Sequence, residues 1–328
     1  MKAVVFTEYG PPEVLQLREV QTPAAKDDEV LVEVHAAAVN YGDWALLRGK
    51  PFAVRLMTGG LLKPKNPILG ADIAGRVAAV GPNVTQFQPG DEVFGDISAA
   101  GFGGFAEYVA VSQNPLALKP TNSSFEQAAA VPMSGVVALQ GLRDKGGIQA
   151  GQKVLIVGAS GGNGTFAVQI AKSFGAEVTG VCSTRNVDLV RSIGADHVIN
   201  YTQEDFTQSE QRYDLILTTG GYRPILDYRR ALSPGGTYVM VGGAMAQVYE
   251  AMILGPFLSM GGNQRMVNLS AMPHQEDLAS VKDLIEGGQV TPVIDRRYPL
   301  SEVADALRYY GEGHSRGKVV ITVAEGQA

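Results

Sequence analysis

Short apolar stretches, some alternating with polar residues and some continuous, recur through the first 120 residues of the chain. Gly and Pro residues separate them, and short runs of this kind between turn residues are typical of β-strands. Several strands at such close spacing predict a small β-barrel or sandwich. The expected strands are residues 2–6, 29–37, 73–80, 92–94 and 106–111, and helix-forming residues follow at 125–130 and 128–142.

From residue 153 onward, the pattern changes to strands and helices in alternation. This order predicts a parallel, doubly wound sheet with right-handed crossovers. The expected strands are residues 153–157, 177–181, 197–199, 214–217 and 237–241, and the expected helices are 165–174, 188–192, 224–232 and 276–286. A last strand at 318–323 should pair with an edge of the early β-rich sheet. The chain therefore divides into a β-rich domain of residues 1–122 and 293–328 and an α/β domain of residues 123–292.

A glycine-rich loop connects the strand at 153–157 to the helix that follows it. The loop reads GASGGNG from Gly158 to Gly164. Glycines at such a turn let backbone N–H groups approach a pyrophosphate, which rests on the positive N-terminus of the helix. The alternative is a turn that only packs the helix on the strand. The strand before the loop, the helix after it and a second strand ending about 20 residues further on favour a dinucleotide site.

The residues that follow the second strand of this domain indicate which dinucleotide binds. Enzymes that prefer NAD usually carry Asp or Glu there, which accepts from the ribose 2′-hydroxyl. This chain reads VCSTRN from Val181 to Asn186, with two hydroxyls, a guanidinium and no carboxylate. Ser183 and Arg185 are suited to a 2′-phosphate, so the sequence favours NADPH. The alternative is a helix N-cap at Ser183 or Thr184 with a solvated arginine beside it.

Composition argues against several other functional classes. The 328 residues carry 33 acidic and 27 basic side chains, a net charge of −6, whereas nucleic acids and anionic membranes favour clustered Lys and Arg. No apolar run is long enough to span a bilayer, and the first ten residues are typical of a strand and not of a signal peptide. We therefore expect a cytoplasmic protein. One cysteine, Cys182, and four histidines without ligand spacing argue against disulfides and a metal site.

Six segments together resemble the zinc-free quinone oxidoreductase branch of the medium-chain dehydrogenase/reductase superfamily. Besides the glycine loop they are residues 1–40, PILGADIAGRVAAV at 67–80, GDEVFGDISAAGFGGFAEYVAV at 90–111, GADHVINY at 194–201 and GHSRGKVVI at 313–321. Zinc-binding members carry Gly-His-Glu where this chain has Gly70-Ala71-Asp72, and a catalytic Cys near Asn40. The resemblance implies a metal-free, NADPH-dependent reductase of quinones or of the C=C bond of α,β-unsaturated carbonyls.

The resemblance also implies an architecture and an assembly. The fold class would be α/β, with a GroES-like β-rich barrel domain and a Rossmann doubly wound parallel-sheet domain, and the substrate would lie in the cleft between them. Subunits would pair through edge strands into a homodimer. The apolar residues 252–260 and 267–270 could supply such an edge strand and its cover.

The cofactor contacts that the resemblance implies lie in four loops. Asn163 stands where the family usually has Val, but contact through its N–H should survive, and Tyr201 has an alternative role as an aromatic residue that closes its strand. The pyrophosphate would contact Ser160, Gly161, Gly162 and Asn163, the adenosine phosphate would contact Ser183, Arg185 and Tyr201, and Gly242 and Gly243 would lie near the nicotinamide.

The candidate catalytic residues lie in NYGDW, residues 40–44, which resembles the substrate-side segment of the family. Hydride addition to an enone builds negative charge on the carbonyl oxygen and requires a proton at the α-carbon. Asn40 or the Tyr41 hydroxyl could donate to that oxygen, and Asp43 could orient a neighbour. In the alternative, Asn40 caps a helical turn, Asp43 bonds the backbone and Trp44 is core. The family usually has Pro in place of Tyr41, and many members take the proton from solvent.

Two other functions remain open. One is an NADPH-binding regulatory or structural protein with little turnover, as among crystallins that resemble this branch. The other is a trans-acting enoyl reductase that serves as partner of a synthase.

Overall fold

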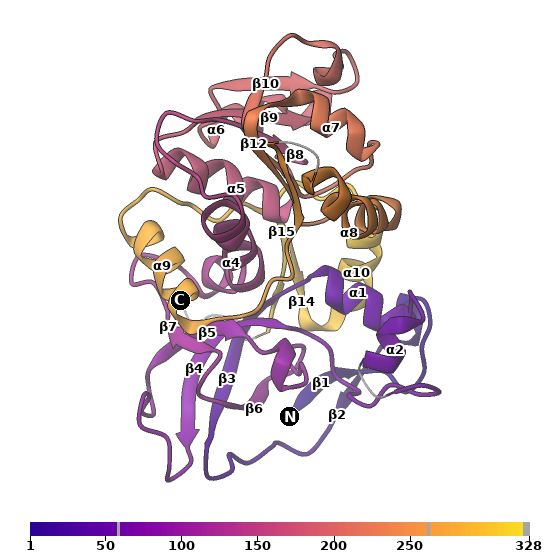
Figure 1. Ribbon diagram of the computed structural model, residues 1–328. Coiled ribbons are helices and arrows are strands. Elements are labelled where there is room, and N and C mark those ends of the chain that lie inside the picture. Colours follow the sequence, from indigo (N-terminus) through magenta and orange to yellow (C-terminus); the bar gives the residue numbers. More distant parts are fainter. Residues whose placement is uncertain (58–59, 261–262, 324–328) are drawn as a thin grey trace. The chain divides into compact units, whose positions relative to one another are not determined.

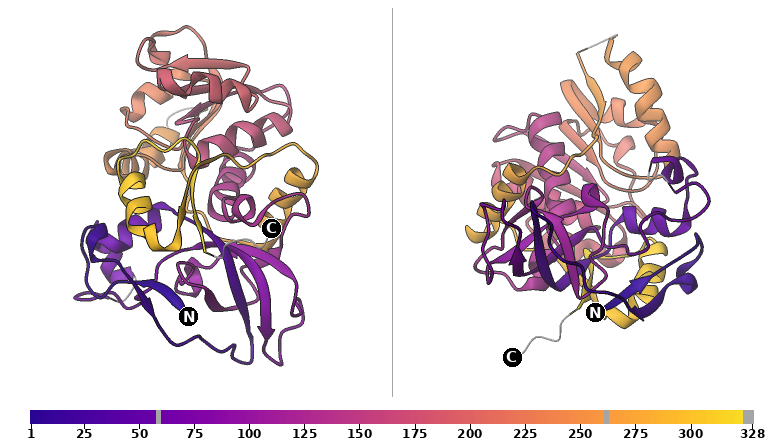
Figure 2. Two further views of the ribbon diagram at one scale, coloured as in Figure 1. Left: turned by 180° about the vertical axis from the view of Figure 1, so that it is seen from behind. Right: turned by 90° about the horizontal axis from the view of Figure 1, so that it is seen from below.

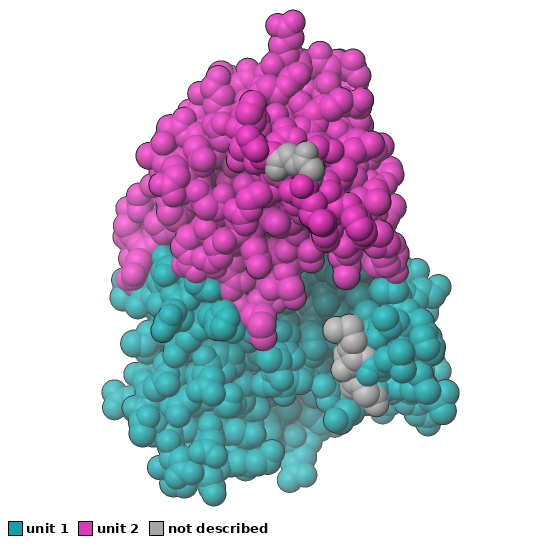
Figure 3. Space-filling view, in the orientation of Figure 1, with its two compact units in different colours: residues 1–133, 273–282, 292–328 teal, residues 134–272, 283–291 magenta. Residues whose placement is uncertain are grey.

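The computed structural model describes residues 1–57, 60–260 and 263–323, and the chain forms two compact units (Figure 3). Unit 1 contains Met1–Met133, Pro273–Lys282 and Pro292–Ala328, and unit 2 contains Ser134–Met272 and Asp283–Thr291. Unit 1 thus extends beyond residue 122, because helix α3 (Phe125–Ala129) packs on strands β3 and β4. It also takes in the first part of α9 (Gln275–Glu286), where Gln275 Nε2 donates to Leu116 O at 2.6 Å.

Unit 1 is built on a seven-stranded sheet in the order β14-β15-β3-β4-β5-β7, with β6 paired to β3 (Figure 1). Its strands are β3 (Glu29–Ala38), β4 (Asp72–Val80), β5 (Glu92–Asp96), β6 (Tyr108–Ser112), β7 (Leu116–Leu118), β14 (Ile294–Pro299) and β15 (Lys318–Thr322), and β1 (Lys2–Val5) pairs with β2 (Gln16–Glu19) in a separate ribbon. Alternate residues of β3 are fully buried, among them Val30, Val32 and Val34. This alternation is what a sheet with one face on a core requires.

The last strand returns to the sheet that the first residues began. β15 runs antiparallel to β3, with Val320 opposite Ala38, as the sequence predicted. Figure 2 shows this yellow segment beside the purple strands of the early chain in both views. Helix α10 (Val303–Gly311) buries Val303, Ala306 and Leu307 against the same core. Two further helices, α1 (Tyr41–Arg48) and α2 (Ala53–Met57), complete the unit.

Unit 2 is a six-stranded sheet with every pairing parallel, in the order β10-β9-β8-β11-β12-β13. The strands are β8 (Lys153–Val157), β9 (Glu177–Cys182), β10 (His197–Asn200), β11 (Tyr213–Thr218), β12 (Leu232–Met240) and β13 (Arg265–Asn268). The helices are α4 (Pro132–Gln140), α5 (Gly162–Ser173), α6 (Val187–Ser192), α7 (Ile225–Ala231) and α8 (Met245–Met260). Numbered along the chain, the strand order is 3-2-1-4-5-6, which is the dinucleotide-binding arrangement. The predicted fold class is confirmed.

Some elements differ from the prediction. The helical stretch expected at 128–142 is divided: α3 ends at Ala129, and α4 begins at Pro132, a residue whose fixed φ suits the first turn of a helix. α4 then continues into a π-helical turn, Gly141–Lys145. By contrast, the expected edge strand and its cover are present: β13 is the edge strand of the sheet, and residues 252–260 belong to helix α8, which packs on it.

Candidate functional site

The carboxyl ends of the parallel strands in unit 2 lie at one edge of the sheet. The register places Val157 of β8 beside Val181 of β9 and beside Thr218 of β11, and Thr218 lies beside Met240 of β12. β8 and β11 are neighbours, but β9 and β10, which follow β8, lie on one side of this pair, and β12 and β13, which follow β11, lie on the other side. Ligands of open α/β sheets bind outside the carboxyl ends at such a reversal of strand order. A ligand is therefore expected at the loops that follow these strands.

The glycine loop after β8 makes a turn that only glycines permit. Gly158 has φ +84°, and a Cβ on Gly164 would lie 2.0 Å from the Gly158 carbonyl oxygen. Helix α5 begins directly after the N-cap residue Gly161, so its first N–H groups face out of the loop. These groups fit the pyrophosphate of a dinucleotide.

Thr219, which follows β11, supports the loop and was not identified from the sequence. Its hydroxyl lies 3.1 Å from both the Val157 and Gly158 carbonyl oxygens and donates to them. Thr218 ends the buried strand β11 and Thr219 follows it, and these two consecutive threonines were the signal that the sequence offered.

Asn186 joins two of the predicted cofactor contacts, although sequence reasoning did not single it out. Its Nδ2 donates to Ser160 Oγ at 2.8 Å and to Ser183 Oγ at 3.3 Å. The side chain is 5% exposed, and its Oδ1 is buried without a hydrogen-bond partner in the part of the chain that the structure describes. An unpaired buried acceptor is costly, and a ribose hydroxyl is a donor of the right kind for it. The site therefore fits a dinucleotide at this atom too.

The remaining predicted cofactor residues lie at the same sheet edge. Arg185 is exposed in the short 3₁₀ turn Thr184–Asn186 after β9. Tyr201 is 57% exposed, and its backbone N–H donates to Cys182 O, next to Ser183. The loop after β12 returns toward β11, where the Gly242 N–H donates to Thr218 O. A Cβ on Gly243, which follows, would lie 2.8 Å from the Gly221 carbonyl oxygen.

In unit 1, the candidate catalytic segment forms the start of helix α1. Asn40 is its N-cap residue, and the Asn40 N–H donates to Asp43 Oδ2 at 2.9 Å. Asp43 Oδ1 accepts from the Gly70 N–H at 2.8 Å, so Asp43 bonds the backbone, as in the alternative interpretation. Tyr41 is 55% exposed, whereas Asn40 is 4% exposed.

A buried charged cluster lies beside this segment, at the ends of β3, β4 and β15. Lys318 Nζ lies 2.5 Å from Asn40 Oδ1 and 3.4 Å from Asp72 Oδ2, and the Lys318 side chain is 3% exposed. Asp72 Oδ1 accepts from the Met133 N–H at 3.1 Å. Burial raises the pKa of both Asp72 and Asp43 to about 7, and the Lys318 ammonium opposes this rise in both. In the sequence, Lys318 is marked only as the first residue of a strand.

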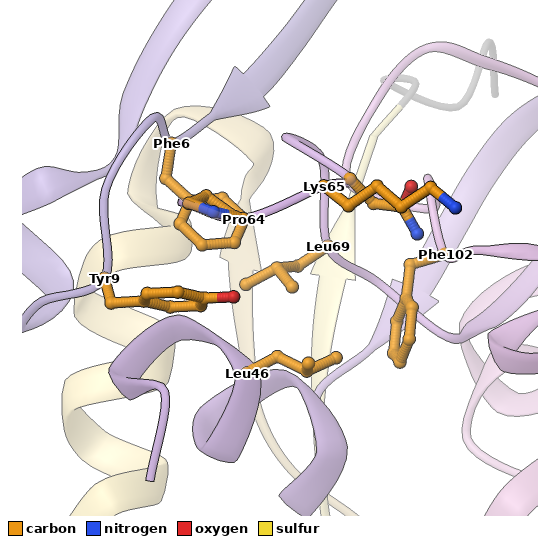
Figure 4. Close-up of a pocket in the computed structure, with 8 residues that line it drawn as sticks. Phe6, Tyr9, Leu46, Pro64, Lys65, Leu69 and Phe102 are labelled. Atoms are coloured by element: carbon orange, nitrogen blue, oxygen red, sulfur yellow. The ribbon is translucent and has the colours of Figure 1, made fainter. Parts of the chain in front are cut away.

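A small pocket lies near α1 in unit 1 (Figure 4). Phe102 at its side has φ +68°, the left-handed region that bulky residues rarely adopt. The Phe102 ring also approaches α1, because a Cβ on Gly42 would lie 3.8 Å from its Cε1. The lining is mostly apolar and consists of Phe6, Tyr9, Leu46, Pro64, Lys65, Asn66, Leu69 and Phe102.

Cys182 is a core residue of β9. It is 2% exposed, and burial raises the pKa of its thiol to about 11. Within residues 1–57, 60–260 and 263–323, no three His, Cys, Asp or Glu side chains are grouped so as to hold a metal ion. None of the helices described is both long and apolar enough to cross a membrane.

Comparisons with known proteins agree with both units. Residues 26–121 match the family model of the alcohol dehydrogenase GroES-like domain, and residues 193–321 match that of the zinc-binding dehydrogenases. The chain is 35% identical to the 2-methylene-furan-3-one reductase of Solanum lycopersicum, over 98% of this chain and 79% of that one. It is 34% identical to the chloroplastic NADPH-dependent alkenal/one oxidoreductase of Arabidopsis thaliana, with the same coverage. Among solved structures, the quinone oxidoreductase from Coxiella burnetii superposes with a TM-score of 0.88 at 30% identity, covering 99% of each chain.

Proposed function

Because this chain belongs to the zinc-free quinone oxidoreductase branch of the medium-chain dehydrogenase/reductase superfamily, we propose that it reduces quinones or the C=C bond of α,β-unsaturated carbonyls with NADPH. One observation carries the proposal: a glycine turn at the carboxyl end of β8 lies beside a β9 loop with hydroxyls and a guanidinium. Bound NADPH supplies the hydride. The chain's own residues bind it, orient it and stabilise the charge that develops on the substrate.

The preference for NADPH over NADH rests on the loop after β9. Residues 181–186 contain no carboxylate to accept from a ribose 2′-hydroxyl. Arg185 offers the 2′-phosphate a planar, permanently charged fork. Ser183 lies in the same turn and shares Asn186 with Ser160 of the pyrophosphate loop. One side chain would thus link the two phosphate sites.

On the substrate side, we assign the carbonyl oxygen to the start of α1. The Asn40 amide and the exposed Tyr41 hydroxyl are the donors available there, and Asp43 holds the turn that carries them. A donor placed at the oxygen lowers the barrier because it acts where charge develops. We assign the proton that is added to the α-carbon to solvent, because water can supply it without a dedicated side chain.

The pocket beside α1 is the proposed place for the apolar part of the substrate. Its walls are mostly apolar, with Lys65 and Asn66 as polar members, and small-molecule sites are usually concave and apolar with a few polar groups. Phe102 is held in a conformation that costs of order 1–3 kcal/mol, and such strain gathers at functional sites.

A homodimer is the proposed assembly. Helix α8 leaves Ile253 60% exposed, Phe257 70% exposed and Met260 84% exposed, and β13 is the edge strand packed beside this helix. A large exposed apolar patch at a sheet edge is typical of an interaction surface. A cytoplasmic location stays a prediction.

The test is steady-state consumption of NADPH with 1,4-benzoquinone and with methyl vinyl ketone. The proposal expects sustained turnover with at least one of them. Saturable NADPH binding without turnover would instead favour a regulatory or structural protein. Turnover only on addition of a synthase-bound enoyl substrate would favour the trans-acting partner.

A further inference from the structure

Lys318 is a buried lysine whose ammonium contacts the candidate catalytic segment. Its side chain is 3% exposed, and its Nζ lies 2.5 Å from Asn40 Oδ1. Lys318 begins β15, while Asn40 follows β3 and Asp72 begins β4, three strands that adjoin in the sheet (Figure 1). The three side chains therefore meet at one end of this sheet, although their residues lie far apart in the sequence.

Burying this ammonium requires nearby negative charge. Asp72 is fully buried at 3.4 Å, and two further buried carboxyls, those of Asp43 and Asp96, interact with the cluster. Taking an ion out of water costs several kcal/mol even after relaxation, and an apolar side chain of similar volume would often stabilise the fold as well or better. The ion pair alone is thus a weak explanation for a lysine at this position.

The ammonium and the first turn of α1 both act on the Asn40 amide, since the Asn40 side chain also accepts from the Asp43 N–H in the capping box. An ammonium has three donors and no acceptor, so the Asn40 carbonyl oxygen must face it and the NH₂ group must face away. That NH₂ group makes a long contact of 3.4 Å with Ala38 O, and the Asn40 side chain also hydrogen-bonds the Asp72 carboxyl. A hydrogen bond to a charged donor also polarises the amide, which strengthens its NH₂ as a donor. A polarised Asn40 amide donates more strongly to whichever acceptor its NH₂ group meets.

We propose that Lys318 is a positioning residue for the reaction, because its buried ammonium orients and polarises Asn40 toward the oxygen on which negative charge develops. This inference rests on the proposed function. The Lys318 ammonium lies between Asn40, which follows β3, and Asp72, which begins β4.

The test compares three variants by kcat, by the KM of the enone, by the Kd of NADPH and by melting temperature. Lys318→Met removes the charge and keeps a side chain of similar length. Lys318→Met combined with Asp72→Asn removes both members of the ion pair, while the amide oxygen introduced at position 72 can still accept from the Met133 N–H. Lys119→Met is the matched control, because Lys119 is also a buried lysine of unit 1, 7% exposed and 3.2 Å from Glu92.

We expect both Lys318 variants to lose about ten- to a hundredfold in kcat, less than the loss on removing an oxyanion donor outright. The Kd of NADPH, which binds through unit 2, should change less than twofold. The double variant should recover melting temperature but not kcat, and Lys119→Met should lose stability and keep kcat.

Two results would overturn the inference: kcat within twofold of wild type in either Lys318 variant, or recovery of kcat together with stability in the double variant. If Lys318→Met does not fold, the double variant decides. A wild-type protein without turnover would refute the proposed function and this inference with it, whereas active wild type with active variants refutes the inference alone.

Discussion

Replacing Arg185 with alanine should weaken the binding of NADPH and leave the binding of NADH almost unchanged. Arg185 is exposed in the turn after β9, and no carboxylate shares that turn. Hydrogen bonds to charged groups contribute about 1.5–3 kcal/mol, and about 1.4 kcal/mol is a factor of ten in affinity. Arg185→Ala should therefore weaken NADPH binding about ten- to a hundredfold, and its exposure to solvent favours the lower part of that range. NADH lacks the phosphate and should bind almost as before.

The assay is a titration of each cofactor, followed by fluorescence or calorimetry, in wild type and variants at two salt concentrations. The loss for NADPH should shrink at high salt, since an exposed ion pair is screened. Ser183→Ala should show a smaller loss of the same kind. Arg191→Ala is the matched control, because Arg191 is an exposed arginine of α6 in the same unit. Equal losses for NADPH and NADH would show that Arg185 supports the loop and does not bind the phosphate.

Four further predictions concern the turn, the metal, the pH dependence and the assembly. Gly164→Ala should abolish NADPH binding, because its Cβ would lie 2.0 Å from the Gly158 carbonyl oxygen. Gly161→Ala should keep the fold, because the nearest atom would lie 3.6 Å from its Cβ. Equal melting temperatures of the two variants, measured with and without NADPH, would contradict this. Activity should survive dialysis against a strong chelator, and a loss that zinc restores would refute a metal-free site. Burial raises the pKa of Asp43 from about 3.8 to about 7, so the native state binds more protons than the unfolded state between these pH values. Wild type should therefore lose stability relative to Asp43→Asn as pH rises from about 4 to about 7. Denaturant melts in which the difference in free energy of unfolding between the two proteins stays constant would contradict this. Sedimentation should show a dimer that Phe257→Asp converts to a 34.7 kDa monomer, and a monomeric wild type at micromolar concentration would refute the dimer.

The sequence predicted most of unit 2 because buried parallel strands read as continuous apolar runs between glycines. β8 was expected at its observed bounds, and the glycine loop could be interpreted because it lay between a strand and a helix. β2 was missed because all four of its residues are exposed, so no apolar pattern marks it. α8 was not recognised because it is apolar on most sides and contains Pro256.

The sequence predicted only those parts of the site whose residues lie close together along the chain. Glycine turns and the absent carboxylate after β9 can be read from neighbouring residues. The partners of Lys318 cannot, because Asn40 and Asp72 are 278 and 246 residues away and meet it only through the pairing of β15 with β3 and of β3 with β4. Asn186 likewise acquires its role from Ser160, on another loop.

Hydride delivery to the C=C bond can be followed with NADPH that carries deuterium at both C4 positions of the nicotinamide, so that the transferred hydride is labelled whichever face is used. With methyl vinyl ketone as substrate, we predict butanone that carries one deuterium at the former β-carbon and a solvent proton at the α-carbon. Mass spectrometry and NMR of the product locate the label. Deuterium at the carbonyl carbon of an alcohol, or a product without label, would contradict a reductase that delivers hydride to the C=C bond.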